Sequence, residues 1–267
     1  MRERKKKGRS DKGSWMYRLS VLGLLLILGI SAGILYDHLV AVPEANRKMV
    51  EKIKEDFPGE DLPDPLARKE KPAGKKGSLS PLVDLVSLQE QYPDIQGWLM
   101  IPETGIDYPV LQSSAEEPEY YIHRNYQGEP DVNGSLFLQW DCDVREGENL
   151  VVYGHNMNSG VMFGNLDRYA EKEYCQAHPL VYFQTLDGVA VYRVTAVLKT
   201  DVSVFPFQQA FFPEPDGLAE YVRQAKRLEL FDNGETFDID EADQVLTLVT
   251  CSYEWSGARN LVIAVRE

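Results

Sequence analysis

The sequence predicts a mainly β protein, a closed barrel of eight strands with a helix before the first strand and another before the penultimate strand. Short runs of aliphatic, aromatic and β-branched residues recur along residues 81–267, separated by Gly, Pro, Asn and Asp. Many short strands with turn residues between them are typical of a barrel, because closure leaves no exposed sheet edge. The expected strands are Gly97–Ile101, Tyr108–Gln112, Ser135–Leu138, Leu150–Tyr153, Leu180–Thr185, Val189–Leu198, Val245–Thr250 and Asn260–Val265.

Three stretches of this body have helical spacing. After Ser80 and Pro81, leucine and valine recur every three or four residues, which predicts a capped amphipathic helix up to about Gln91. Residues 165–174 form the second expected helix. The third, Asp216–Leu230, carries its apolar residues on one face and lies just ahead of the penultimate strand.

The N-terminal region has the charge pattern of a membrane anchor. Residues 1–18 carry eight Lys or Arg against two acidic residues, and the 18 residues of Leu19–Tyr36 hold no charge. That length just spans a hydrocarbon core of about 30 Å, and the basic flank predicts a cytoplasmic N-terminus and an exported body. A cleaved signal peptide is the competing interpretation. The apolar run exceeds the roughly 7–15 residues of a signal-peptide core, which favours a retained anchor.

Between anchor and body, residues 37–80 are polar and interrupted by five prolines. We expect an extracellular spacer here, with a short polar helix over residues 44–56. The predicted organisation is therefore a cytoplasmic segment 1–18, a single-pass anchor 19–36, a spacer 37–80 and one domain over 81–267.

The charge balance excludes a class of partner. The chain has a net charge of −14, although its first 18 residues are strongly basic. The body is therefore more acidic than the total suggests, and it would repel a phosphate backbone. We expect no nucleic-acid partner.

The clearest candidate for chemistry is Cys251, at the end of an apolar strand. A turn of about seven residues follows, and the next strand opens with Arg259. Because neighbouring strands lie about 4.8 Å apart, the guanidinium is expected beside the thiol at the rim of the sheet, where it would favour the thiolate. His155 similarly follows an apolar strand, at the glycine turn Gly154. On the residues alone, a buried cysteine and a structural histidine remain open alternatives.

The other cysteines suggest no chemistry. The three cysteines show neither CxxC spacing nor a metal-ligand pattern with the four histidines, so we predict no metal site. Cys142 and Cys175 are expected to be bystanders, with a disulfide between them as the alternative.

These motifs together resemble one family. The segment TLVTC (247–251), with Arg259 eight residues later and GHN at 154–156, resembles the sortases, and within that family class B. The resemblance covers roughly residues 80–267. A helix before the cysteine strand is typical of class B, and the lack of a second hydrophobic span before Glu267 argues against the pilin-polymerising class C. Further matching segments are GWLMIPETGIDYPVLQ (97–112), HRNYQG (123–128), NGSLFL (133–138) and YGHNMNSGVMFGNLDRY (153–169).

The resemblance implies a membrane-anchored extracellular cysteine transpeptidase of a Gram-positive bacterium, with no metal or organic cofactor. Cys251 would attack the carbonyl of Thr in a C-terminal sorting motif, His155 would be the acid and base, and Arg259 would bind backbone carbonyls and the oxyanion. Its partners would be sorting-signal proteins and an amine of a peptidoglycan precursor or cross-bridge. The implied substrate-binding residues are Asn125, Thr250 and Tyr253.

The sequence identifies no third partner for the histidine. Asn156 is adjacent to His155, but neighbours in a strand point to opposite faces. Ser252 occupies a position where some relatives carry an acidic residue.

Two other classes of protein are alternatives. A papain-like peptidoglycan hydrolase places its cysteine at a helix N-terminus upstream of the histidine. Here His155 precedes Cys251 by 96 residues, and the cysteine follows a strand. A non-enzymatic, membrane-anchored extracellular β-barrel binding module would bury Cys251 and protect it from alkylating reagents. The exposure of this thiol therefore separates the binding module from an enzyme.

Overall fold

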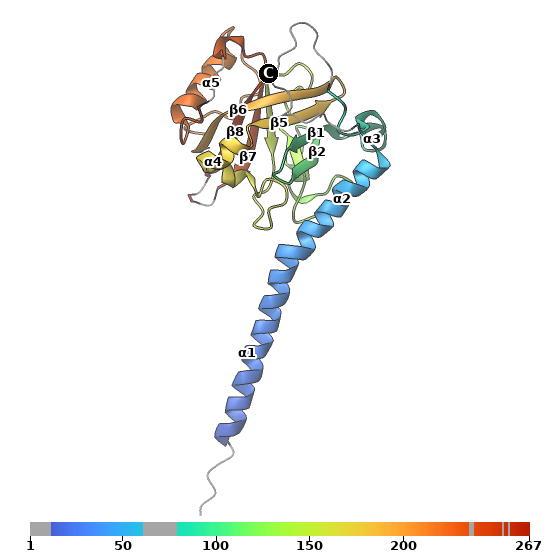
Figure 1. Cartoon of the computed structure of the whole chain (residues 1–267), viewed down its shortest axis with the longest axis vertical. Helices are drawn as coiled ribbons and strands as arrows, with labels where there is room; N and C mark the ends of the chain where they lie inside the picture. The colour runs from blue at the N-terminus through green and yellow to red at the C-terminus, as the bar shows by residue number, and fades with distance from the viewer. Residues whose placement is uncertain (1–11, 61–78, 235–237, 253, 256) are drawn as a thin grey trace, which may run out of the picture. The chain divides into compact units, whose positions relative to one another are not determined.

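The computed structural model describes residues 12–60, 79–234, 238–252, 254–255 and 257–267 (Figure 1). Eight strands close into a barrel in the order β1-β2-β3-β4-β7-β8-β6-β5, which confirms the predicted fold class. Every predicted strand is present, with ends shifted by two residues at most. The strands are β1 Ile95–Ile101, β2 Ile106–Gln112, β3 Leu136–Leu138, β4 Asn149–Tyr153, β5 Leu180–Thr185, β6 Gly188–Thr200, β7 Val245–Cys251 and β8 Arg259–Arg266.

Two parallel pairings determine where the strand ends lie. β2 runs parallel to β3, and β4 runs parallel to β7 with Tyr153 opposite Val249. The carboxyl ends of β4 and β7 therefore meet at the same rim of the barrel. β7 pairs along its whole length with the antiparallel β8, from Val245 opposite Val265 to Cys251 opposite Arg259.

The helix α5, Gly217–Leu228, lies on the outside of the barrel (Figure 1). It packs against β6, and its buried apolar face confirms the helix predicted before the penultimate strand. The Tyr221 hydroxyl lies 2.9 Å from the Thr247 hydroxyl of β7, and its ring packs on Phe205 and Phe212. This cover explains why β7 is buried at every position except Cys251.

The helix before β1 is α3, Leu85–Gln91, and it begins later than predicted. The backbone N–H groups of Leu82 and Val83 donate to the Gln184 side chain at 2.6 and 3.1 Å, which holds these two residues outside the helix. Asp84 is the N-cap, and its carboxylate accepts from the Ser87 N–H at 3.2 Å. The start predicted at Ser80 and Pro81 is therefore wrong.

The single helix predicted over residues 165–174 is also wrong. The chain forms a 3₁₀ helix, η4 Leu166–Ala170, and then α4 Lys172–Ala177, with Glu171 extended between them. Residues five apart on one α-helix are rotated by about 140°. The break allows Tyr169 and Tyr174 both to be buried, with ring centroids 5.3 Å apart.

The N-terminal region is helical. It comprises α1 Lys12–Tyr36, the π-helical turn η1 Asp37–Ala41 and α2 Val42–Asp56. By length and composition this helix is apolar enough to cross a membrane near its N-terminus. The helix predicted over 44–56 is present as part of α2.

The chain divides into two compact units, with the division between Ala45 and Asn46. The second half of α2 belongs to the barrel unit and packs on it. Ile53 is 2% exposed, and Lys54 pairs with Asp107 of β2. The Asn46 side chain donates to the Tyr108 hydroxyl at 2.7 Å.

Candidate active site

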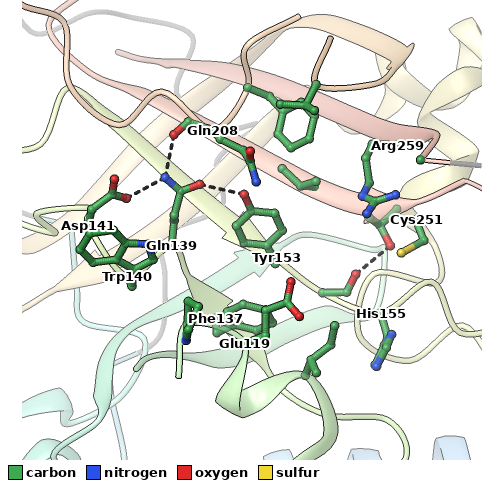
Figure 2. A pocket seen from close by; sticks show the side chains of 18 residues that line it. Glu119, Phe137, Gln139, Trp140, Asp141, Tyr153, His155, Gln208, Cys251 and Arg259 are labelled. Atoms are coloured by element: carbon green, nitrogen blue, oxygen red, sulfur yellow. Dashed lines mark hydrogen bonds between the residues drawn. The ribbon is translucent and has the colours of Figure 1, made fainter. Parts of the chain in front are cut away.

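Cys251 and Arg259 lie opposite each other at the rim, as the last residue of β7 and the first of β8. His155 lies two residues beyond β4, which runs parallel to β7. The topology thus brings all three predicted catalytic residues to one cavity. Figure 2 shows Cys251 between the Arg259 guanidinium and the His155 ring.

The turn that carries His155 is fastened to β7. The Gly154 N–H donates to the Val249 carbonyl at 3.1 Å, and the Thr250 hydroxyl donates to the Gly154 carbonyl at 2.8 Å. A Cβ at Gly154 would lie 2.4 Å from a Leu136 methyl carbon, so this close approach requires glycine. The backbone of His155 is therefore fixed relative to the strand that ends in Cys251.

The His155 ring is half-buried, and its pKa lies below the ordinary value. Burial lowers its pKa from the ordinary 6.5, a backbone hydrogen bond to Ile122 raises it, and the charge of His123 lowers it. The two imidazoles are stacked, with centroids 5.2 Å apart and planes 29° apart. The His155 Nε2 atom is buried and has no hydrogen-bond partner among the described residues.

The exposure of the three thiols differs. All three cysteines are free, so the Cys142–Cys175 disulfide is not formed; Cys142 and Cys175 are buried and Cys251 is partly exposed. Burial raises the pKa of the Cys142 thiol to about 12. Of the three cysteines, Cys251 alone lines the cavity. A non-enzymatic binding module would instead bury this thiol.

Arg259 contributes a fixed positive charge beside the thiol. Its Nη1 group donates one hydrogen bond to the carbonyl of the preceding residue, Ala258, at 2.9 Å. Arg259 forms no ion pair with any described residue. A guanidinium has five N–H donors in a rigid fork, so most of its hydrogen-bonding capacity remains for backbone carbonyls or an oxyanion.

The cavity has a volume of about 550 Å³ and extends away from Cys251, His155 and Arg259 (Figure 2). A hydrogen-bonded cluster forms its far wall: the Gln139 amide donates to Asp141 and to the Gln208 carbonyl, both at 2.6 Å, and accepts from Tyr153 at 2.8 Å. Such mutual bonding holds the wall in one shape. Its other lining residues include Glu119, Ile122, Phe137, Trp140, Val202 and Phe207.

The three predicted substrate-binding residues lie in different places. Thr250 lines the cavity, although its hydroxyl is engaged with Gly154. Asn125 does not line the cavity; its side chain accepts from the backbone N–H groups of Gln127 and Glu129, both at 3.0 Å, and so organises its own loop. Tyr253 lies outside the described residues. No described group of three or more His, Cys, Asp or Glu residues could hold a metal ion.

Sequence reasoning missed a polar cluster behind the site. The Asn156 amide donates to Asp167 at 2.7 Å and to the Cys251 carbonyl at 2.9 Å, and the Asn260 amide also donates to Asp167. Asn156 does not follow strand alternation, because β4 ends at Tyr153 and the chain turns at Gly154. The sequence offers one sign of this cluster. Asn156 and Asn260 each stand directly after a candidate catalytic residue.

Comparison with known proteins identifies the class to which this fold and site belong. A model of the sortase domain matches residues 99–267, and the chain therefore belongs to the sortase family of cysteine transpeptidases.

Within the family the chain is a class B sortase. Sortase B of Listeria monocytogenes is 33% identical over 174 residues, which cover 64% of this chain and 68% of that protein. Sortase B of Staphylococcus aureus is 23% identical over 180 residues, covering 67% and 72%. The crystal structure of sortase B from Bacillus anthracis has a TM-score of 0.65 at 26% identity, covering 84% of this chain and 96% of that chain.

Proposed function

We propose that this sortase cleaves a C-terminal sorting motif of exported proteins after a Thr residue and joins the new carboxyl end to a cell-wall amine. The observation that carries the proposal is the presence in one cavity of a partly exposed thiol, an imidazole and a guanidinium that forms no ion pair with a described residue. The catalytic residues are Cys251, His155 and Arg259.

In the first half-reaction, the Cys251 thiolate adds to the Thr carbonyl carbon. Arg259 binds the oxyanion that forms, since its charge is fixed and its donors are free to point into the cavity. The C–N bond then breaks, and protonated His155 gives its Nε2 proton to the departing amine. The product is a thioester between the substrate and Cys251, and neutral His155.

In the second half-reaction, an incoming amine attacks the thioester carbonyl. Neutral His155 accepts a proton from this amine, the C–S bond breaks, and the Cys251 thiolate is restored. A lowered histidine pKa suits this step, because the neutral base must be abundant near pH 7. Water in place of the amine gives hydrolysis. We propose an amine of a peptidoglycan precursor or cross-bridge as the natural acceptor.

We further propose that the apolar helix retains the enzyme in the cell membrane, with residues 1–18 in the cytoplasm and the barrel outside. The support is the 18-residue uncharged segment and its basic flank. Residues 37–45 then belong to the helical connection between membrane and barrel, and residues 46–267 form the extracellular unit.

The test uses the full chain in detergent with a panel of quenched fluorescent peptides that carry different sorting motifs, with and without an amine acceptor. We expect cleavage of one motif, a joined product when the amine is present, and loss of both in Cys251→Ala. Cleavage that persists in Cys251→Ala would refute the assignment of the nucleophile.

A further inference from the structure

Asp167 contacts the residues that follow two members of the catalytic trio. Its two carboxylate oxygens accept hydrogen bonds from different amides, Oδ2 from Asn156 and Oδ1 from Asn260. Asn156 directly follows His155, and Asn260 directly follows Arg259. Asp167 belongs to η4, Leu166–Ala170, which is not part of the barrel sheet.

The same cluster reaches the nucleophile. The Asn156 amide nitrogen, which carries two protons, also donates to the Cys251 carbonyl at 2.9 Å. One proton thus serves Asp167 and the other serves the backbone of Cys251. The carboxylate fixes the rotation of the Asn156 amide, and this rotation aims the second N–H at the nucleophile's own carbonyl.

The hydrogen bonds to Asp167 matter because both amides that donate them are buried. Asn156 and Asn260 are 8% and 6% exposed, so water cannot readily replace a hydrogen bond to Asp167 that is lost there. Asp167 itself is exposed, which means that it can be replaced without opening a cavity in the core. Its role is therefore one of connection between segments and not of filling space.

We propose that Asp167 is a positioning residue that holds the three segments carrying His155, Cys251 and Arg259 in register. It does not touch the reacting atoms, and it acts through the amides of Asn156 and Asn260. The inference rests on the proposed transpeptidase function for its kinetic consequence, since a misplacement of about 1 Å at a catalytic group costs about a hundredfold in rate.

The amide geometry also predicts which substitution is tolerated best. Asn260 Oδ1 has no hydrogen-bond partner among the described residues. In Asp167→Asn the new oxygen can accept from Asn156, and the new NH₂ can donate to Asn260 once that amide rotates to present its oxygen. The hydrogen bonds, and not the negative charge, are what the cluster requires.

The decisive experiment compares Asp167→Ala with Asp167→Asn in the full chain in detergent, using the cleaved peptide and, separately, iodoacetamide alkylation of Cys251. For Asp167→Ala we expect kcat to fall ten- to a hundredfold with KM within about twofold. We also expect slower alkylation at pH 7, because a displaced imidazole can no longer accept the proton of the attacking thiol. Asp167→Asn should recover at least a third of the wild-type kcat.

The matched control is Asp187→Ala, which removes an exposed carboxylate paired with Arg145 in the turn between β5 and β6. It should leave kcat and the alkylation rate within twofold of wild type. Alkylation needs no sorting motif, so it tests the positioning role even if no peptide is cleaved.

An Asp167→Ala variant that melts normally but keeps wild-type kcat and alkylation would overturn the proposal. So would an Asp167→Asn variant as impaired as Asp167→Ala, because charge would then be the requirement. If Asp167→Ala fails to fold, Asn260→Ala decides: we expect a three- to tenfold lower kcat, and an unchanged kcat would contradict the proposal.

Discussion

The docking of α2 on the barrel predicts that Ile53→Ala destabilises the catalytic unit, although this residue lies in a segment that reads as a spacer. Ile53 is 2% exposed on α2. The substitution removes three buried carbons at about 0.8 kcal/mol each, or about 2.4 kcal/mol. The cavity left behind brings the expected loss in the free energy of unfolding to about 2–4 kcal/mol.

Thermal unfolding of the full chain in detergent, followed by near-UV circular dichroism, measures this loss. For a unit of this size we expect the Tm to fall by about 5–12 °C. Lys52→Ala is the matched control, because its side chain is exposed on the same helix and should change stability by less than about 0.5 kcal/mol. Equal Tm values for both variants would refute the packing of α2 on the barrel. A confirmed loss would mean that soluble fragments should begin at Asn46 and not near Ser80.

Three further predictions concern the site. Arg259→Lys should lower kcat/KM by about 10²–10³-fold in the peptide assay, because a single ammonium cannot reproduce the guanidinium fork; a change below threefold would exclude the oxyanion role. His123→Gln should raise the pKa of His155, because the charge of His123 lowers it; ring NMR titration in a Cys251→Ala background measures the shift, and an unchanged pKa would contradict it. The lowered pKa also means that His155 contributes stability above pH 6.5 that is lost as the pH falls toward its folded pKa. Alkylation of the native chain at pH 7 should label Cys251 and spare Cys142 and Cys175, which peptide mapping would check; labelling of all three would contradict their burial.

The strands were predictable from sequence because their pattern is local. Runs such as Val245–Thr250 combine β-branched residues with turn residues at both ends, and this is enough to place a strand. That Cys251, His155 and Arg259 come together in one cavity was predictable for a related reason: Cys251 and Arg259 lie at strand ends and His155 just beyond one, and these ends meet at a rim.

Features that depend on contacts across the chain were not predictable. The start of α3 depends on Gln184, about 100 residues away. The break at Glu171 depends on the burial of Tyr169 and Tyr174 together. The docking of α2 rests on two buried apolar residues, Val50 and Ile53, within a polar helix, too few to reveal a packed face.

The Asp167 cluster shows the same limitation at the site. Strand alternation assigns Asn156 to the face opposite His155, which holds only while the strand continues. The strand ends at Tyr153, and the turn redirects the Asn156 amide toward Cys251. No local pattern indicates that turn geometry, since it depends on the parallel pairing of β4 with β7.

Covalent catalysis by Cys251 is tested most directly by capture of the thioester on this residue. The full chain would be mixed with its cleaved peptide in the absence of an amine, quenched in acid, and measured by intact mass and peptide mapping. We predict an added mass equal to the N-terminal peptide fragment, located on Cys251, removed by hydroxylamine and absent in Cys251→Ala. Peptide cleavage with no such adduct, or with the adduct on another residue, would contradict covalent catalysis by this cysteine.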